Sequence, residues 1–191
     1  MKILLHICCA PCSIYPVDFL RKNGYEVEGL FYNPNIHPFR EYERRAETLL
    51  NYAREINLPV LWENKYGMEK FLRQVVNYEG ERCRICYEER MKKAAGVARG
   101  KNYAGFTTTL LFSKYQNHEL LRSIGREISN REGIPFIYFD FRAGWTYGRE
   151  ETKKLGLYSQ SYCGCIFSEK ERYFREKKFK ERFSPTFEEI E

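Results

Sequence analysis

Residues 3–13 read ILLHICCAPCS, an apolar run followed at once by three cysteines within five positions. The apolar run predicts a buried strand over residues 2–8, with His6 as a core residue, and the next residues predict a helix over 14–23. In α/β proteins, the loop that joins a strand to the next helix at the carboxyl end of a parallel sheet usually carries the chemistry. This stretch therefore predicts the fold class and the position of the site together.

Strands and helices continue to alternate along the chain. The helix expected over residues 39–56 has an apolar face, formed by Tyr42, Ala46, Leu49, Leu50 and Ala53. Further strands are expected at residues 25–32, 58–62, 103–106 and 134–139. Because strand–helix–strand units connect with a right-handed crossover, the pattern favours an α/β fold with a doubly wound, mostly parallel, five-stranded Rossmann-like sheet in the order 3-2-1-4-5.

The composition fits one globular domain. Of 191 residues, 43% are hydrophobic and 30% are charged, a balance that argues against disorder. We expect a catalytic core over about residues 1–142 and a helical, cysteine-bearing extension over about 143–191. No apolar run approaches the roughly 20 residues of a membrane helix, and the N-terminus lacks the features of a secretion signal. A cytoplasmic, monomeric protein without membrane attachment is therefore expected.

The seven cysteines form three groups that are close in sequence: Cys8, Cys9 and Cys12; Cys83 and Cys86; Cys163 and Cys165. In a reducing compartment, clustered cysteines are more often metal ligands or redox groups than structural disulfides. The spacing Cys83-x-x-Cys86 lets two thiolates face one metal, and alone it suits zinc, an iron–sulfur cluster or a redox dithiol. With the first group it offers five thiols, one more than a four-cysteine site uses. A cubane accommodates adjacent cysteines better than a single zinc does, so an iron–sulfur site is favoured over structural zinc or free thiols.

Cys163-Gly164-Cys165 is a separate pattern. A disulfide across one intervening residue closes a small, strained ring, and strained disulfides have more oxidising potentials. The pair is therefore suited to redox cycling. The alternative is that both residues are further metal ligands or free thiols.

Several polar residues lie at expected strand ends or in loops. Thr107, Thr108 and Thr109 stand at a strand-to-helix switch, where they suit a phosphate or polar substrate or cap a helix. His37, in a loop rich in proline and asparagine, is a candidate substrate contact, although a lone histidine is more often structural. Asp140, after the fifth expected strand, is a candidate hard metal ligand or an N-cap.

The formal net charge is +6, and positive charge gathers near the C-terminus. Residues 170–182 contain seven Lys or Arg against three Glu, interleaved with Tyr173, Phe174 and Phe179. Such a stretch suits a phosphate-facing surface, and the alternative is a solvated amphipathic helix.

Six segments resemble, in the same order, the motifs of the QueH-type epoxyqueuosine reductases: HICCAPCS, YNPNIHPFREYERR, RCRIC, GFTTTLLFSKYQNHELL, FDFR and SQSYCGCIFS. They span about residues 6–168, so the basic tail lies outside the resemblance. The family is related in fold to the adenine-nucleotide alpha-hydrolase-like (PP-loop) enzymes. Here the first loop carries cysteines where those enzymes have a glycine-rich pyrophosphate loop, so use of ATP is not expected.

The resemblance implies reduction of epoxyqueuosine to queuosine at the wobble position of tRNA, without cobalamin. It implies a 4Fe-4S cluster whose ligands are Cys8, Cys9, Cys83 and Cys86. It also implies a redox-active pair formed by Cys163 and Cys165. A second, mononuclear iron is also attributed to the family, and its candidate ligands here are Cys12 and Asp140. A tRNA substrate gives the basic tail a purpose, with Lys177, Lys178 and Lys180 as expected contacts. The reaction needs an electron donor, which the sequence does not identify.

Two other functions are compatible with parts of the sequence. A PP-loop-like tRNA thiolation enzyme also uses a cluster, but it needs ATP and a pyrophosphate loop, which the segment CCAPCS does not provide. A zinc-stabilised RNA-binding module would use the same thiols without catalysis. Analysis of metal and acid-labile sulfide separates the zinc module from both enzymes.

Overall fold

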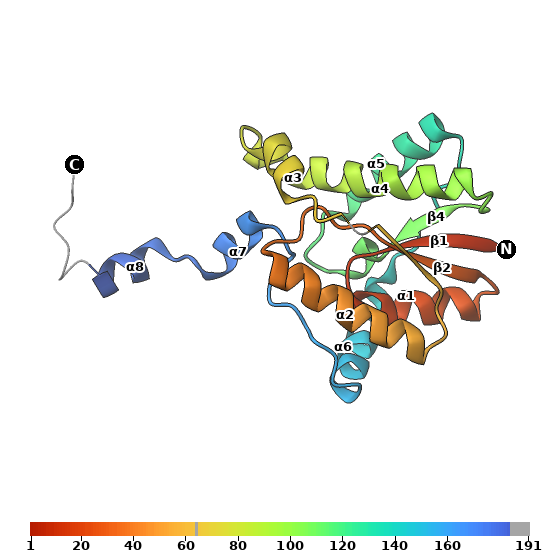
Figure 1. Cartoon of the computed structure of the whole chain (residues 1–191), viewed down its shortest axis with the longest axis horizontal. Coiled ribbons are helices and arrows are strands. Elements are labelled where there is room, and N and C mark those ends of the chain that lie inside the picture. The colour runs from red at the N-terminus through yellow and green to blue at the C-terminus, as the bar shows by residue number, and fades with distance from the viewer. Residues whose placement is uncertain (64, 184–191) are drawn as a thin grey trace.

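The computed structural model describes residues 1–63 and 65–183. At its centre is a parallel sheet of four strands in the order β3-β2-β1-β4 (Figure 1). The strands are β1 (Lys2–Ile7), β2 (Glu26–Phe31), β3 (Val60–Trp62) and β4 (Phe106–Thr108). β1 pairs in parallel with both β2 and β4, so its carboxyl end lies in the middle of the sheet edge. The expected α/β fold with a parallel sheet is confirmed.

Helices cover both faces of the sheet (Figure 1). One face carries α1 (Ala10–Lys22), α2 (Phe39–Glu55) and α6 (Trp145–Lys154), and the other carries α3 (Met68–Val75), α4 (Arg82–Gly100) and α5 (His118–Glu132). Three short 3₁₀ helices connect these elements: η1 (Glu79–Glu81), η2 (Thr109–Phe112) and η3 (Phe141–Gly144). This is the doubly wound arrangement that the alternating sequence predicts.

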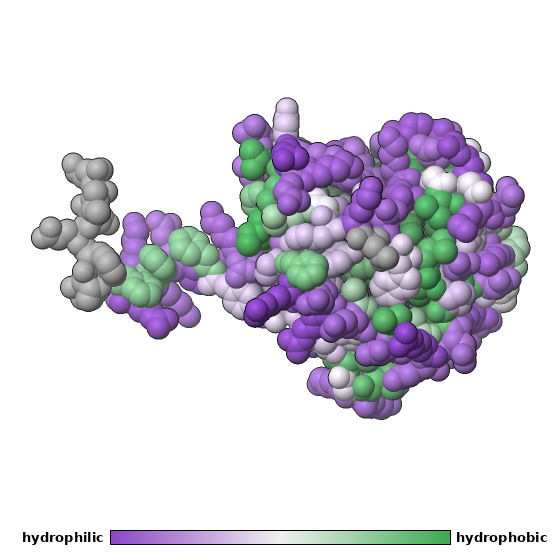
Figure 2. Space-filling view, viewed as in Figure 1, coloured by the Kyte–Doolittle hydropathy of each residue, from purple (hydrophilic) through white to green (hydrophobic). Residues whose placement is uncertain are grey.

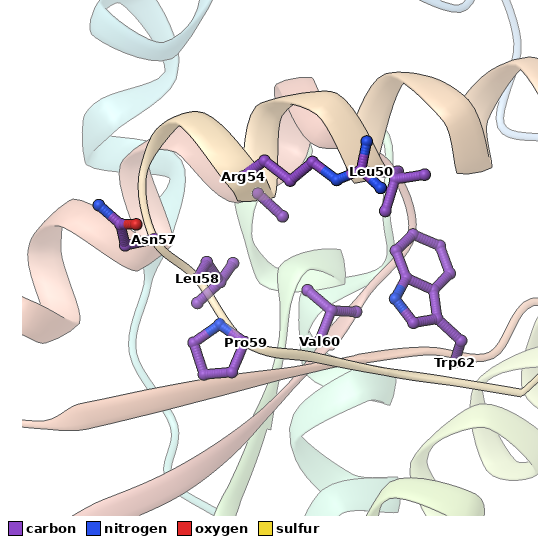
Figure 3. Close-up of a pocket in the computed structure, with 8 residues that line it drawn as sticks. Leu50, Arg54, Asn57, Leu58, Pro59, Val60 and Trp62 are labelled. Atoms are coloured by element: carbon purple, nitrogen blue, oxygen red, sulfur yellow. The ribbon is translucent and has the colours of Figure 1, made fainter.

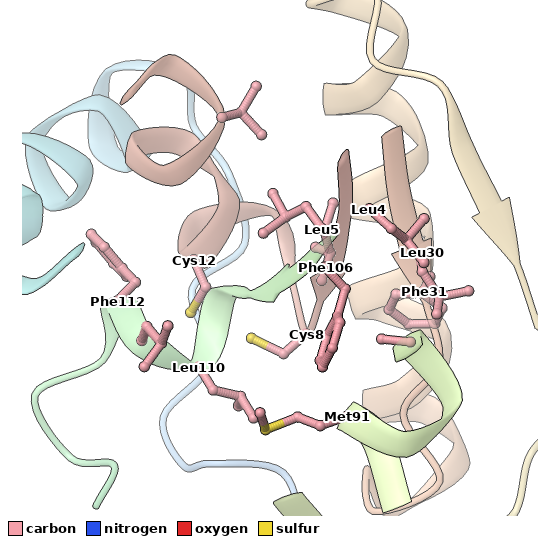
Figure 4. Packing of buried hydrophobic residues seen from close by; sticks show 14 of the residues in the cluster. Leu4, Leu5, Cys8, Cys12, Leu30, Phe31, Met91, Phe106, Leu110 and Phe112 are labelled. Atoms are coloured by element: carbon pink, nitrogen blue, oxygen red, sulfur yellow. The ribbon is translucent and has the colours of Figure 1, made fainter. Parts of the chain in front are cut away.

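β1 is the core strand. Every side chain from Ile3 to Ile7 is fully buried, because helices pack on both faces of the sheet, and the strand therefore reads as a continuous apolar run. Figure 4 shows Leu4 and Leu5 packed beside Phe106, with Met91 of α4 nearby. Burial of one such side chain contributes about 1.5–3 kcal/mol. The packing thus fixes the end of β1 and the cysteine loop that follows it.

Residues 134–139 do not form the expected fifth strand, so this prediction is wrong. Residues 134–139 make only an isolated bridge between Phe106 and Phe136, although Ile137 N–H donates to the Phe106 carbonyl oxygen at 2.8 Å. Pro135 has no N–H to offer a ladder, and Phe139 turns its ring against Phe19 of α1 at 5.1 Å. The segment therefore lies along β4 without becoming a strand.

The buried face of α2 also differs from the expected one. Leu50 is 36% exposed, whereas Arg45 is 1% exposed and Tyr52 is buried. Apolar periodicity does not reveal a buried cation, because arginine counts as a surface residue unless its partners are known. The partners of Arg45 belong to the site described below.

The expected single basic helix is divided in two. α7 (Ile166–Tyr173) ends before Phe174, α8 (Glu176–Phe183) follows, and together they project from the body of the fold (Figure 1). We call residues 166–183 the C-terminal arm. Figure 2 shows its apolar surface bordered by hydrophilic surface, and Phe174 packs against Phe179 at 5.8 Å between ring centres. Residues 184–191 of the expected extension lie outside the described residues, and the division near residue 142 stays a prediction. None of the described helices has the length and apolar character to span a membrane.

Candidate active site

The first three cysteines form a compact cluster at the carboxyl end of β1. Cys8 follows the strand, Cys9 is the N-cap of α1, and Cys12 lies in its first turn. Their sulfur atoms all lie within 4.8 Å of one another, and each residue is at most 9% exposed. Figure 4 shows the sulfur atoms of Cys8 and Cys12 beside each other, and the Cys8 and Cys9 sulfurs are 3.7 Å apart. The cluster offers three soft, buried ligands to one metal centre.

Hydrogen bonds make Cys8 the most acidic thiol of this cluster. Contacts from the Cys12 and Cys9 thiols, and then from the Thr109 hydroxyl at 3.3 Å, hold the pKa of Cys8 well below its usual range. Burial raises the pKa of Cys9, and the bond to Cys8 raises that of Cys12. Cys8 is therefore the thiol of this cluster that ionises most easily, and a bound cation would favour the ionised form of all three.

His6 lies next to this cluster and is a core residue, as expected. Its Nε2 donates to the Tyr32 carbonyl oxygen at 3.0 Å, which leaves Nδ1 to accept from the Thr108 hydroxyl at 2.9 Å. Burial lowers the pKa of His6 to about 4, so the ring is neutral at pH 7. The Thr108 oxygen also accepts from the Leu110 N–H and caps η2. The hydroxyl of Thr108 is thus used within the fold.

The second pair of cysteines begins α4. Cys83 is exposed and Cys86 is buried, where it packs with Cys165, Phe71 and Val75. Burial raises the pKa of Cys86 to about 12. The second and third cysteine groups are therefore neighbours in the fold, although 77 or more positions separate them in sequence (163 minus 86).

Arg90 is hydrogen-bonded to the second group, and its charge also acts on a thiol of each of the other two. It is 1% exposed, and it donates from Nη2 to the Cys86 sulfur at 3.0 Å and from Nε to the Cys86 carbonyl oxygen at 3.2 Å. Within residues 1–63 and 65–183, no carboxylate pairs with it. Burial raises the pKa of Cys86 while the charge of Arg90 lowers it, and that charge also lowers the pKa of Cys8. Cys163 itself is exposed. The charge of one buried cation therefore acts on thiols from three separate segments.

The loop that carries Cys163 is bound to α2 by a second buried guanidinium. Arg45 donates from Nη1 to the Cys163 carbonyl oxygen at 2.9 Å and from Nη2 to the Tyr162 carbonyl oxygen at 3.0 Å. Its Nε pairs with Glu41 at 2.7 Å, so this cation has a carboxylate partner. All seven cysteines are free, including the pair in this loop.

Gly164 allows the close approach between this loop and residues 33–38. Its φ of +139° favours glycine, and a Cβ atom would lie 3.1 Å from Ile36 Cγ1 and 3.3 Å from Arg45 Nη1. The His37 N–H donates to the Gly164 carbonyl oxygen at 2.8 Å, and the Tyr162 hydroxyl donates to the His37 carbonyl oxygen at 2.5 Å. Glycine is therefore favoured between the two cysteines, because a side chain there would crowd Ile36 and Arg45.

Two glutamines also contact the thiols. Gln160 donates from Nε2 to the Cys9 sulfur at 3.0 Å, and Gln116 donates from Nε2 to the Cys163 sulfur at 3.4 Å. Sequence reasoning missed both, as it missed Arg45 and Arg90. Gln116, Gln160 and Arg45 fall inside the segments quoted for the family resemblance, so a signal was present for three of the four. Arg90 falls outside those segments.

Other expected site residues have partners within the fold. His37 is buried, shares a 3.1 Å hydrogen bond with the Pro34 carbonyl oxygen through Nε2, and packs on Phe71. Asp140 is the N-cap of η3 and pairs with Arg142 at 2.5 Å, which confirms the capping alternative. Thr107 is fully buried. Lys177 and Lys178 lie on α8 in the C-terminal arm.

Two surface hollows complete the description. One has a volume of about 450 Å³ and lies between α2 and β3. Figure 3 shows residues that line it, among them Leu50, Arg54 and Trp62. The other, of about 670 Å³, lies over α4 beside Tyr32 and Glu89. No cysteine lines either hollow, so the thiol groups remain the candidate site.

Comparison with known proteins agrees with the resemblance. The sequence profile of the family described as Epoxyqueuosine reductase QueH matches residues 3–171, a range that contains every cysteine and ends within α7. The Epoxyqueuosine reductase QueH of Dehalococcoides mccartyi is 37% identical over 173 residues, which cover 90% of this chain and 94% of that protein. The Epoxyqueuosine reductase QueH of Thermotoga maritima is 36% identical over 180 residues, covering 89% and 91%.

Among solved structures, the fold is similar to that of a "predicted subunit of tRNA methyltransferase" from Methanocaldococcus jannaschii. The TM-score is 0.54 at 15% identity, over 80% of this chain and 76% of that chain. This likeness supports the α/β fold alone, whereas the profile and the curated relatives identify the family. The chain belongs to the epoxyqueuosine reductase QueH family.

Proposed function

We propose that this chain reduces epoxyqueuosine in tRNA to queuosine in the cytoplasm, without cobalamin. The names of its relatives support the reaction. The observation that carries the proposal is the compact trio of Cys8, Cys9 and Cys12, together with a buried cation, Arg90, that is bonded to the Cys86 sulfur and acts electrostatically on Cys8 and Cys163. Side chains other than thiols do not supply electrons, so a reductase needs thiols, a redox cofactor or both.

The reaction determines what the site must provide. Removal of an epoxide oxygen breaks two C–O bonds, forms a C=C bond and releases water, which consumes two electrons and two protons. A dithiol that closes to a disulfide provides both in the required number. An external electron donor must then reduce the disulfide again. Under this proposal Cys163 and Cys165 are the dithiol, and both are free thiols in the structure.

The residues present fit a thiolate-bound metal cluster. Arg90 is a buried cation without a carboxylate partner among the described residues, and a buried charge persists only beside an opposite charge. An anionic set of metal-bound thiolates supplies that charge. We propose that a 4Fe-4S cluster is held by the residues that the resemblance implies, namely Cys8, Cys9, Cys83 and Cys86.

Cys12 is then left as a ligand for a second, mononuclear iron. Its sulfur lies within 4.8 Å of the Cys8 and Cys9 sulfurs, close enough to serve a neighbouring metal. Asp140 is not included, because its carboxylate is bound to Arg142. When bound, the cluster supplies single electrons and an iron with an open position polarises an oxygen atom of the substrate.

The C-terminal arm is proposed to contact the tRNA. Lys177 and Lys178 are exposed on α8 beside the half-exposed rings of Phe174 and Phe179. Basic side chains bind phosphates, and aromatic rings stack on unpaired bases of single-stranded RNA. Lys177 and Lys178 lie beyond residue 171, where the match to the family profile ends, so the proposal for them rests on the charge and exposure of the arm.

The test is anaerobic incubation of reconstituted protein with a chemical reductant and tRNA that carries epoxyqueuosine, followed by mass spectrometry of the nucleosides. Queuosine is expected, without added ATP. Protein that holds iron and sulfide but forms no queuosine would refute the proposed reaction. One zinc per chain and no sulfide would favour the RNA-binding module, and an ATP-dependent thiolated nucleoside would favour the thiolation enzyme.

A further inference from the structure

We propose that Arg90 is the permanent counter-charge of the metal-binding thiolates and sets the reduction potential of the cluster through its bond to the Cys86 sulfur. The inference rests on the proposed function, because it takes Cys86 as a cluster ligand. Arg90 does not touch the substrate in this proposal. It is a positioning residue that acts through a ligand.

The helix fixes this contact. Cys86 and Arg90 are four residues apart in α4 and therefore lie on one face of the helix. The guanidinium reaches back to the preceding turn, where Nε binds the Cys86 carbonyl oxygen and Nη2 binds the sulfur. Two donors from one planar group hold the side chain in a single orientation. The sulfur therefore receives a charge-assisted hydrogen bond at a fixed place.

Comparison with Arg45 shows why Arg90 points to an anionic ligand set. Both guanidinium groups are 1% exposed. Arg45 is neutralised by Glu41 at 2.7 Å. Arg90 instead contacts the Cys86 sulfur, and the other groups whose charge would act on it most are the thiols of Cys163 and Cys8 and the hydroxyl of Tyr87. Within the described chain, the charge of Arg90 is therefore balanced only when sulfur is ionised.

The direction of the effect follows from electrostatics. Reduction adds an electron to a site that already carries thiolates, and a nearby cation and an N–H donor to sulfur both favour the reduced form. Removal of Arg90 therefore lowers the midpoint potential. At a fixed applied potential, we expect the ratio of reduced to oxidised cluster to fall at least tenfold, which is 59 mV for a one-electron couple.

The experiment compares Arg90→Met, Arg90→Lys and the matched control Arg84→Met. Arg84 is also in α4, but it is partly exposed and pairs with Glu88 at 2.9 Å. Each protein is purified anaerobically and reconstituted with iron and sulfide. Iron and sulfide are quantified, and the midpoint potential is measured by a redox titration followed by electron paramagnetic resonance. In Arg90→Met, the ratio of reduced to oxidised cluster at a fixed potential is expected to fall tenfold or more. The fall is expected to be smaller in Arg90→Lys and smallest in Arg84→Met.

Equal potentials and full iron content in both Arg90 variants would overturn the inference. If Arg90→Met loses its iron but keeps the native circular dichroism spectrum, and Arg90→Lys keeps its iron, the counter-charge role is supported. The proposed reaction is judged separately, from the wild-type protein. Wild-type protein that holds the cluster without forming queuosine refutes the reaction but not the role of Arg90.

Discussion

The guanidinium of Arg45 and the carbonyl oxygen of Cys163, 118 positions apart in sequence, are joined by a hydrogen bond of 2.9 Å. The same side chain holds the neighbouring Tyr162 carbonyl oxygen, and Glu41 neutralises its charge. The peptide groups on both sides of the Cys163 Cα atom are thereby hydrogen-bonded to a side chain of α2. The position of the proposed dithiol depends on a helix from the first third of the chain.

Replacement of Arg45 should therefore impair turnover without removing the thiols. A hydrogen bond to a charged donor contributes about 1.5–3 kcal/mol, so Arg45→Met is expected to lower kcat about 10- to 100-fold, with little change in KM for tRNA. Iron content should stay at the wild-type value. The control is Arg54→Met at an exposed position near the end of α2. Wild-type kcat in Arg45→Met would contradict the positioning role.

Cys12 and Cys83 should differ in what they bind. In our assignment Cys83→Ala loses the cluster, and with it both sulfide and most iron. Cys12→Ala keeps the full sulfide content and loses about one iron per chain. Anaerobic iron and sulfide analysis distinguishes the two. The reverse pattern, with sulfide lost from Cys12→Ala alone, would make the compact cluster of Cys8, Cys9 and Cys12 the main ligand set.

The dithiol is tested by Cys163→Ala. Turnover should stop because one of the two sulfur atoms that form the disulfide is missing, while the absorption and resonance spectra of the cluster remain. Ser161→Ala, an exposed change in the same loop, serves as the control and should keep its activity. Full activity in Cys163→Ala would exclude the dithiol from the reaction.

Charge reversal on the C-terminal arm should weaken tRNA binding. Substitution of Lys177, Lys178 and Lys180 by Glu is expected to lower the affinity for tRNA about tenfold or more at low salt. The slope of log affinity against log salt concentration should also become shallower, by about one for each phosphate that the arm no longer neutralises. Filter binding over a range of salt concentrations measures both. The matched control reverses three exposed lysines outside the arm, Lys22, Lys101 and Lys153. Equal affinities of the two variants would leave the arm without a role in binding.

His37 should make stability depend on pH. Burial lowers the pKa of His37 in the folded protein, while the unfolded chain keeps a value of about 6.5. As pH falls below about 6.5, the unfolded state takes up the proton first, so the free energy of unfolding decreases until the folded pKa is reached. Urea unfolding at pH 7.5, 6.5 and 5.5 measures this, with His37→Gln as the comparison. An identical pH dependence in the two proteins would rule out His37 as its source.

Much of the fold was predictable because the signal is local. The apolar run in β1 and the alternation of strands and helices follow from periodicity. The order β3-β2-β1-β4 matches the first four strands of the expected doubly wound order, which right-handed crossovers permit but do not by themselves determine. The strand prediction for residues 134–139 was wrong because Pro135 and the packing of Phe139 prevent regular pairing with β4. The proline is visible in the sequence, whereas the packing of Phe139 is a tertiary contact. The prediction that Leu50 lies on the buried face of α2 was wrong for a similar reason. Tertiary contacts bury Arg45 on that helix, while Leu50 is left exposed.

The candidate site was predictable only as a set of thiols. Sequence spacing indicates chelation, but it does not say that Cys12 lies within 4.8 Å of Cys8 and Cys9, or that Cys86 packs against Cys165. Arg90 was beyond reach, because a charged residue in the middle of a helix rich in Lys, Arg and Glu resembles any solvent-facing position. Its burial depends on partners far away in the chain.

The Arg45 contact with the loop of Cys163 also bears on how the protein is made. Cys8 and Cys9 leave the ribosome first, but Gln160, which donates to the Cys9 sulfur, comes 151 positions later. Since such distant contacts close only after the sheet has formed, a nascent chain exposes its first thiols to solvent before the pocket exists. Under the proposed assignment, insertion of the metal is therefore expected to follow translation, and a metal delivery system that meets the finished chain would suit this protein better than one that acts during its synthesis.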